Sequence, residues 1–293
     1  MRVETDSATI EERVQGRARR IGFLTVVVAT LALFVVMVPP DITHPVTGWL
    51  PDDSYGRYVE FFYGDETLAN MAAHRHHMLA FSMAIWIVLV GMTVQLRKPV
   101  RKQAPLWAAA AAVVMMLVFE VTLVGFDPST LILVAPILAA VALHPRPLPA
   151  EGISWTGPGR AVAAVAAGTA LAYGFAEARF QVGGGATDIH GVDGHYAFMA
   201  AAAVILAVAA ILGASNLTGA RITAWTAGGI GTLMGAFFIG FPDVSSSPGI
   251  GWGIVAVLLG LAYLVRVGIR LQPGRDVTYE ADSSGPRERD RSD

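Results

Sequence analysis

The chain of 293 residues contains no cysteine, which excludes disulfide bonds and metal sites built from thiolates. It also has little charge, because Asp, Glu, Lys and Arg together make up 15% of its residues. A glycine-rich phosphate loop, a G-x-S-x-G nucleophile elbow and an H-E-x-x-H zinc motif are absent from the sequence. We therefore expect neither a nucleotide-binding domain nor one of these hydrolase active sites.

In their place the chain has long apolar segments, and hydrophobic residues make up 54% of the sequence. The apolar segments are 21–39, 77–95, 105–125, 129–143, 160–177, 196–214, 222–241 and 249–268. About 20 apolar residues in a helix cross the hydrocarbon core, and a backbone in lipid must satisfy its own hydrogen bonds. The sequence thus predicts an all-α, polytopic integral membrane protein with eight transmembrane helices. The fourth is the shortest and contains Pro136.

Lys and Arg are distributed unevenly between the loops of this topology. Of the 21 basic residues, only Arg57, Arg75 and Arg179 lie on one side of the membrane, and the rest lie on the other. Because positive charge marks the cytoplasmic side, we expect both termini in the cytoplasm and the protein in the cell (plasma) membrane. The basic residues follow the topology instead of forming a patch, which argues against a nucleic-acid surface.

The two halves of the chain share features in the same order. "LVGFDPST" ends the third apolar segment and "FIGFPDVSS" ends the seventh, while "HHMLAFSMA" opens the second and "GHYAFMAAA" opens the sixth. This similarity predicts two parallel four-helix repeats. The expected divisions are a cytoplasmic segment (1–20), a first unit (21–144) with a long outer loop (40–73), a second unit (145–270) and a disordered cytoplasmic tail (271–293).

Histidines gather on the expected outer side. They are His44, His74, His76, His77, His190 and His195, whereas His144 alone lies in a cytoplasmic loop. Asp188 and Asp193 join two of them in the pattern D-x-H-x-x-D-x-H at the mouth of the sixth segment. Imidazole is the commonest metal ligand, and a set of histidines and carboxylates suits copper, iron, nickel or zinc.

We expect His76 or His77, together with His195, to be the principal ligands of the cofactor. The cofactor is either a b-type haem held between two helices or a copper or iron ion. The metal-ligand candidates are His74, His76, His77, Asp188, His190, Asp193 and His195. In this set the two aspartates would orient imidazoles by accepting their second N–H. The alternative for any single histidine is an interfacial side chain with one polar edge in water.

Glu120 lies inside the third apolar segment, near its outer end. An acidic group within a membrane span is costly and marks a candidate functional site. Glu120 is therefore the candidate catalytic residue, either as a proton carrier or as a partner of the ligands. If it is not a ligand, we expect a protonated carboxyl group that is hydrogen-bonded to Thr122 or Ser82. Glu177, near the outer end of the fifth segment, is expected to pair with Arg179.

The layout resembles that of haem A synthase, which has two groups of four helices with histidines at the mouths of the second and sixth. In this chain the correspondence rests on "HRHH" (74–77) and on His195. That family also has histidines on its fourth and eighth helices and a glutamate just before the histidine of the second helix, and this chain lacks these residues. The resemblance is one of layout alone, and membership of the family is not inferred.

The sequence favours a membrane protein that binds haem or a transition metal at its outer face and takes part in electron transfer or oxidation. Whether it is an enzyme stays open. The alternatives are a proton-coupled transporter, with Glu120 as its coupling group, and a non-catalytic subunit of a larger membrane complex. The expected partners are the lipid bilayer, other membrane subunits or an outer-face electron donor, with no nucleic acid and no nucleotide.

Overall fold

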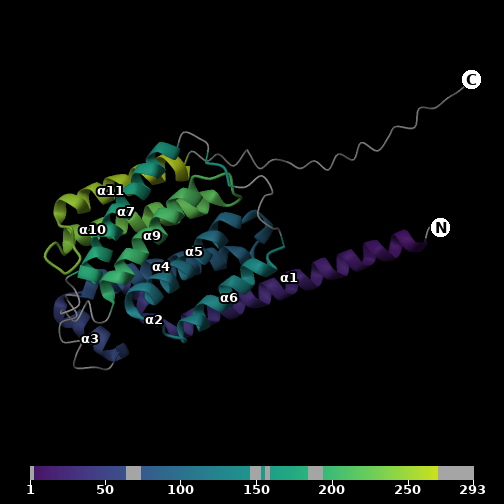
Figure 1. Ribbon diagram of the computed structural model, residues 1–293, viewed down its shortest axis with the longest axis horizontal. Coiled ribbons are helices and arrows are strands. Elements are labelled where there is room, and N and C mark those ends of the chain that lie inside the picture. The colour runs from purple at the N-terminus through teal and green to yellow at the C-terminus, as the bar shows by residue number, and fades with distance from the viewer. Residues whose placement is uncertain (1–2, 64–73, 146–152, 156–158, 184–193, 270–293) are drawn as a thin grey trace, which may run out of the picture.

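The computed structural model describes residues 3–63, 74–145, 153–155, 159–183 and 194–269, and every regular element in these ranges is a helix (Figure 1). The main helices are α1 (Val3–Met37), α4 (Arg75–Thr93), α5 (Gln103–Phe119), α6 (Thr130–Leu143), α7 (Arg160–Gly183), α9 (His195–Gly213), α10 (Ala220–Gly240) and α11 (Ile250–Tyr263). The short elements are α2 (Pro39–Thr47), α3 (Asp52–Tyr63), the 3-10 turns η2 (Val94–Leu96) and η3 (Pro99–Arg101), and the π-helical turns η4 (Glu120–Val124) and η6 (Leu264–Ile269).

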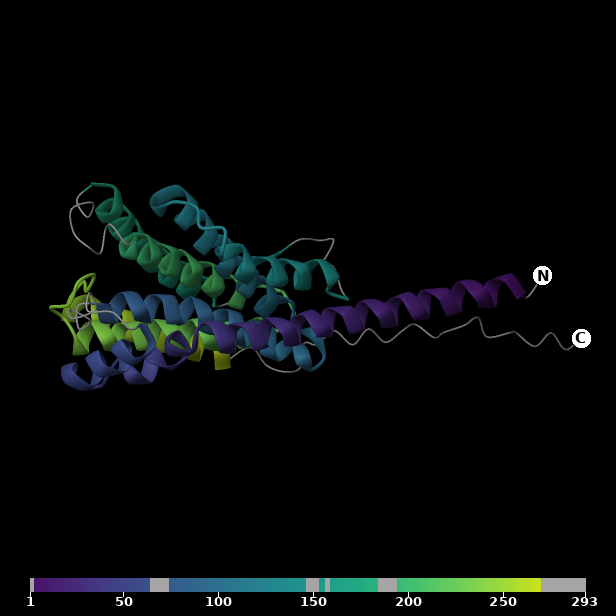
Figure 2. The ribbon, with the colours of Figure 1, turned by 90° about the horizontal axis from the view of Figure 1, so that it is seen from below.

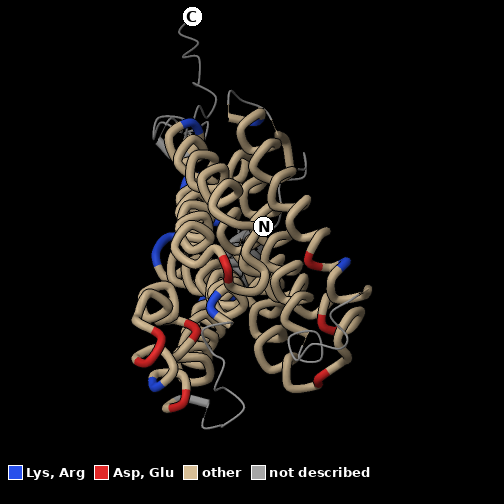
Figure 3. The backbone as a smooth tube through the Cα atoms, turned by 90° about the vertical axis from the view of Figure 1, so that its left-hand side faces the viewer, with Lys and Arg blue, Asp and Glu red and all other residues tan. Residues whose placement is uncertain are grey.

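Within the described residues, seven helical segments are long and apolar enough to cross a membrane. They are Gln15–Met37, Arg75–Leu96, Gln103–Val124, Arg160–Gly183, His195–Gly213, Ala220–Gly240 and Ile250–Val267. Each coincides within a few residues with a segment expected from the sequence, except that Gln15–Met37 starts six residues earlier and Arg160–Gly183 ends six residues later than expected. Charged residues are rare along these helices, which appear mostly tan in Figure 3. The described part of the chain is thus all-helical and has the character of a polytopic membrane protein in contact with lipid.

The remaining expected segment is α6, whose 14 residues extend about 21 Å. This length is less than the thickness of a hydrocarbon core, which is about 30 Å. At its start, Thr130 donates a hydrogen bond to Glu120 at the end of α5. At its end, His144 Nε2 donates to the carbonyl oxygen of Pro99, between α4 and α5. Helix α6 therefore carries the chain from one end of the bundle to the other, and Pro136 does not interrupt it.

The helices form two groups of four. In the first, α1 and α5 each contact α4 and α6, and in the second, α7 and α10 each contact α9 and α11. The two groups therefore close in the same cyclic order, and they meet where α4 and α5 contact α9 and α10. Figures 1 and 2 show α1 projecting from one end of the bundle, with α2 and α3 at the other. We call this other end, which also carries the first residues of α4 and α9, the histidine end.

Burial inside the protein is greatest at the contact between the two groups. In α9 and α4, 72% and 61% of the membrane-spanning window is buried, against 22% for α1, α7 and α11. The two helices whose first turns contain histidines, α4 and α9, are therefore the central ones, and the outer helices present most of the lipid-facing surface.

Small residues bring α10 and α11 close together. A Cβ atom at Gly235 would lie 2.6 Å from the carbonyl oxygen of Gly253, and one at Gly228 would lie 3.1 Å from that of Gly260. Glycine at positions 228 and 235 therefore allows the backbones of α10 and α11 to approach closely. Gly231 differs, because a Cβ there would have its nearest neighbour at 3.9 Å.

Each group of helices also encloses a cavity. One of about 340 Å³ lies between α1, α4, α5 and α6, where Phe81 and Phe198 also contribute to its wall. The other, of about 260 Å³, lies between α7, α9, α10 and α11, and Gly231 borders it.

Candidate functional site

The sequence "HRHH" (74–77) forms the first turn of α4, and all four side chains are buried. Successive residues of a helix are rotated by about 100°, so these side chains leave the helix in different directions. His74 and His77 face α9, Arg75 faces the connection between α2 and α3, and His76 faces α10. The four polar residues at the start of α4 therefore contact three different parts of the protein: α9, the α2–α3 connection and α10.

Three imidazoles converge where α4 meets α9. The ring centroid of His195 lies 5.0 Å from that of His74 and 5.1 Å from that of His77, and the last two are 6.1 Å apart. His74 and His77 share a face because three residues span almost one helical turn. His195 is held by a tight turn at Gly194, where φ is +72° and an added Cβ would overlap Val124. We call His74, His77 and His195 the histidine trio.

His77 is also the first member of a chain of hydrogen bonds. Its Nε2 lies 2.8 Å from Oγ of Ser246, and that hydroxyl donates to a carboxylate oxygen of Glu177 at 2.8 Å. Because the serine hydrogen points to Glu177, the serine oxygen accepts from Nε2–H of His77. In a neutral His77 this arrangement places the nitrogen lone pair on Nδ1. We call His77, Ser246 and Glu177 the polar relay.

The relay depends on the loop between α10 and α11. Ser246 has φ of +65°, a conformation that is uncommon for a residue other than glycine. The carbonyl oxygen of Ser246 accepts a hydrogen bond of 2.8 Å from the hydroxyl of Tyr173 on α7. Helix α7 therefore fixes the position of Ser246 through Tyr173 and Glu177, and the serine fixes the orientation of His77 on α4.

Glu177 does not pair with Arg179, contrary to the expectation from the sequence. The glutamate is 5% exposed and turns inward to Ser246, whereas Arg179 lies on the exposed side of α7. Residues two positions apart on a helix do not face each other, and this spacing should have argued against the pair. The sequence analysis did not identify Tyr173 or Ser246. Ser246 lies in a loop whose residue types are common in turns, so nothing in its sequence marks it as a partner of a histidine.

His76 lies on a different side of α4 from the histidine trio. Its ring stacks on Phe238, with 5.2 Å between the centroids and 21° between the planes. Neither ring nitrogen makes a hydrogen bond of good geometry to any described residue. Of the two neighbouring histidines proposed as principal ligands, His77 is therefore the one that faces His195.

Arg75 fastens the connection between α2 and α3 to the start of α4. Its guanidinium group donates to the carbonyl oxygens of Gly48 and Leu50, and it pairs with Asp52 at 2.8 Å. The side chain of Arg75 is 1% exposed, whereas that of Asp52 is 77% exposed. The hydrogen bonds from Arg75 to the two carbonyl oxygens are therefore buried, whereas the ion pair with Asp52 is accessible to solvent.

Aromatic rings and His44 complete the surroundings of Arg75. The guanidinium carbon lies 4.2 Å from the ring centroid of Tyr55 and 4.6 Å from that of Phe241. His44, fully buried on α2, donates from Nε2 to the backbone carbonyl of Arg75, and its Nδ1 lies 3.4 Å from the hydroxyl of Tyr55. Burial lowers the pKa of His44 to about 4, which keeps the imidazole neutral at neutral pH. Helices α2 and α3 are thus packed against the start of α4, and we call these two helices the α2–α3 cover.

We expect the cover to lose stability as the pH falls from about 6.5 towards 4. In this window the unfolded chain protonates His44 and the folded chain does not, so the free energy of unfolding decreases with falling pH. The loss should approach about 3 kcal/mol near pH 4. Thermal unfolding at several pH values, compared between the wild type and His44→Gln, measures this contribution. A difference between the two proteins that is independent of pH would contradict the assignment.

Glu120 has well-defined partners, and they are not the expected ones. One carboxylate oxygen accepts from the backbone N–H of Asp127 at 2.8 Å, and the other accepts from the hydroxyl of Thr130 at 2.7 Å. Thr122 and Ser82 instead donate to backbone carbonyls of their own helices. Because both oxygens of Glu120 accept, the carboxylate is satisfied by the turn that joins α5 to α6. Glu120 also borders the cavity of the first group of helices.

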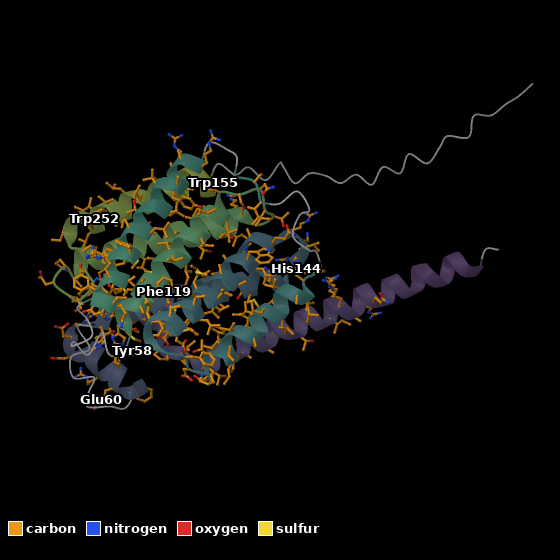
Figure 4. The ribbon with its side chains drawn as sticks, in the orientation of Figure 1. Tyr58, Glu60, Phe119, His144, Trp155 and Trp252 are labelled. Atoms are coloured by element: carbon orange, nitrogen blue, oxygen red, sulfur yellow. The ribbon has the colours of Figure 1, made fainter. Side chains whose placement is uncertain are left out.

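The remaining site candidates are placed as follows. Asp188, His190 and Asp193 lie outside the described residues. Among the residues that are described, no group of three or more His, Cys, Asp or Glu has an arrangement that could hold a metal ion. His144 lies at the end of the bundle opposite Tyr58 and Glu60, as Figure 4 shows. It is therefore separate from the histidine end.

No family model, curated protein or solved structure matches the chain.

Proposed function

We propose that the protein binds one transition-metal ion at its histidine end and uses it in a redox reaction. The histidine trio is the observation that carries this proposal. Three imidazoles from two helices, of which His74 and His77 are buried and His195 is half-buried, lie within 6.1 Å of one another, measured between ring centroids. A set of nitrogen ligands suits copper, iron, nickel or zinc, and a redox reaction selects copper or iron.

The spacing of the rings favours a small ion over a haem. A metal–nitrogen bond of about 2.1 Å places two imidazole centroids about 5 Å apart at tetrahedral angles, and about 6 Å apart on opposite sides of an iron. The distances of 5.0 and 5.1 Å from His195 fit the first case, whereas the distance of 6.1 Å between His74 and His77 is longer than that case requires. As they stand in the structure, the three rings do not form a group that could hold a metal ion, so the proposal requires their side chains to rotate on binding.

The polar relay supports the same proposal. A histidine that binds a metal usually donates its second N–H to a group that fixes the ring. Nε2–H of His77 meets this condition through Ser246 and Glu177, which leaves Nδ1 as the ligand atom. Asp188, His190 and Asp193 remain candidates from the sequence for the same role or for further ligands.

We further propose an eight-pass topology that arose by duplication of a four-helix unit. The path of α6 from Thr130 to His144 supports the eighth crossing, and the identical cyclic order of the two groups of helices supports the duplication. The distribution of Lys and Arg supports cytoplasmic termini in a plasma membrane, which makes the histidine end the outer face.

The decisive experiment is metal binding by the purified protein. We expect about one copper or iron per chain after purification from metal-supplied cells. After chelation, Co²⁺ should bind with the visible absorption of a nitrogen-ligated ion. His77→Ala and His195→Ala should each weaken Co²⁺ binding more than about 100-fold, because even changes to groups behind the ligands cost 10–100-fold.

His76→Phe is the matched control, because it changes the neighbouring histidine and preserves the stacking on Phe238. It should leave Co²⁺ affinity within about twofold of the wild type. Failure of the wild type to bind Co²⁺, copper or iron would exclude the metal site. A Soret band that is lost in His195→Ala would replace the metal ion with a haem.

A further inference from the structure

The cavity between α7, α9, α10 and α11 has the features of a ligand site. Its volume of about 260 Å³ is at the lower limit for small-molecule pockets and suits a single substituted ring. Ala, Gly, Leu, Met, Phe, Pro and Trp residues make most of its wall, and the lining residues that carry a hydroxyl are Thr169, Tyr173 and Tyr263. An apolar pocket with a few fixed polar groups binds a mostly apolar ligand in one orientation.

The cavity is accessible from the bilayer. Its wall includes Trp252 of α11, which is 55% exposed, and Ala172 and Ala176, which lie on the exposed face of α7. Residues on these two helices therefore belong both to the cavity and to the lipid-facing surface. Figure 4 shows Trp252 far from His144 and nearer to the histidine end. A ligand dissolved in the membrane could enter between α7 and α11.

The tyrosine hydroxyls determine what the ligand must offer. Tyr173 donates its hydrogen to the carbonyl oxygen of Ser246 and also lies within hydrogen-bonding distance of the Glu177 carboxyl group, and Tyr263 donates its hydrogen to the carbonyl oxygen of Ala210. Each phenolic oxygen can then only accept a further hydrogen bond. A ligand that donates from its ring therefore fits these groups better than one that carries only acceptors.

The cavity also adjoins the proposed metal site. Tyr173 contacts Ser246, which is hydrogen-bonded to His77, and Pro248 of the same loop is part of the cavity wall. On another side, Phe238 separates the cavity from His76. Only Ser246 would thus separate a ring held at Tyr173 from the imidazole of His77.

We propose that this cavity binds the hydroquinone head group of a membrane-dissolved quinol, with a ring hydroxyl donating to Tyr173. This inference names a substrate class for the proposed redox function. The role of the quinol as a substrate rests on that function, whereas its binding to the cavity does not.

The test is equilibrium binding of a decyl-substituted benzoquinol to the protein in detergent, under anaerobic reducing conditions. We expect saturable binding at one site per chain, and binding of the dimethyl ether of the same compound should be at least tenfold weaker. Tyr173→Phe should bring the two affinities to within about twofold of each other, because it removes the oxygen that accepts from the quinol.

Gly231→Leu tests the location. The nearest atom to a Cβ at Gly231 is 3.9 Å away, so the new side chain can extend into the cavity without a backbone clash. It should reduce quinol affinity at least tenfold. Gly229→Leu is the matched control on the same helix, because position 229 is exposed and has no atom within 4 Å of an added Cβ. It should leave the affinity unchanged.

Equal binding of the quinol and its dimethyl ether to the wild type would overturn the proposal and identify the cavity as a site for lipid chains. Unchanged quinol binding by Gly231→Leu would also overturn it, because the ligand would then lie elsewhere. Titrations with chelator-treated and Co²⁺-loaded protein separate this inference from the metal site. Binding of quinol without binding of metal would refute the proposed function alone, and the reverse would refute this inference alone.

Discussion

Replacing Arg75 with leucine should release the α2–α3 cover from the end of α4. The substitution removes the donors to the carbonyl oxygens of Gly48 and Leu50 and the two ring contacts of the guanidinium group. Buried carbonyl groups left without donors cost about 1–3 kcal/mol each. We expect a loss of about 3 kcal/mol in stability and faster proteolysis within residues 48–63. Thermal unfolding and mapped limited proteolysis measure the two effects.

Two variants separate the buried contacts from the surface charge. Asp52→Asn should cost less than about 1 kcal/mol, because the side chain of Asp52 is 77% exposed and exposed ion pairs contribute little. Arg57→Leu removes an arginine from the same cover and should have a similarly small effect. If Arg75→Leu were no more susceptible to protease than Arg57→Leu, the contacts of Arg75 would not hold the α2–α3 cover in place.

Most of the helical arrangement could be predicted from the sequence. The length of an apolar run and the need to satisfy backbone hydrogen bonds in lipid are local properties, so segments such as 196–214 coincide with helices such as α9. The length of α6 was less accessible, because its 14 residues fall short of a full span. Its crossing of the bundle depends on contacts at both ends, from Glu120 and Pro99, that no hydropathy pattern contains.

The site could be predicted only in part. Residues at the mouths of two central helices must lie at the same end of the bundle, and this is why the sequence led to His77 and His195. The sequence did not distinguish His77 from His76, because both residues are histidines and they differ only in the face of α4 that they occupy. Ser246 was missed for another reason: it lies 169 positions from His77 and reaches it through a backbone conformation that its residue type does not favour.

Glu120 and Glu177 show the limit of arguing from a single buried acid. The sequence singled out Glu120 because it lies deeper in an apolar segment, and the structure gives its carboxylate two donors from the turn before α6. Glu177 was assigned to the interface, yet it is the acid that connects to a histidine. The position of an acid along an apolar segment indicates only the cost of burying it. The role of Glu120 or Glu177 depends on the hydrogen-bond partners of its carboxyl group.

Glu177→Gln should weaken Co²⁺ binding 10–100-fold without unfolding the protein. The neutral amide no longer attracts the hydroxyl hydrogen of Ser246 as a carboxylate does, so the serine no longer holds His77 in the orientation that presents Nδ1. Ser246→Ala should produce a similar loss. The double variant should lose little more than either single variant, because both substitutions interrupt the same chain of hydrogen bonds. Co²⁺ titration followed by visible absorption gives the three affinities.

Glu120→Gln is the control for this prediction, because it replaces the other buried glutamate with an amide and leaves the polar relay intact. Its Co²⁺ affinity should stay within about twofold of the wild type. Nitrogen NMR of the imidazoles gives a readout that does not require metal: wild-type His77 should be protonated on Nε2, and Glu177→Gln should increase the fraction protonated on Nδ1. If Glu120→Gln weakened Co²⁺ binding as much as Glu177→Gln, the loss of a buried acidic group would explain both results without the polar relay. If the tautomer of His77 did not respond to Glu177, the carboxylate would not control the imidazole.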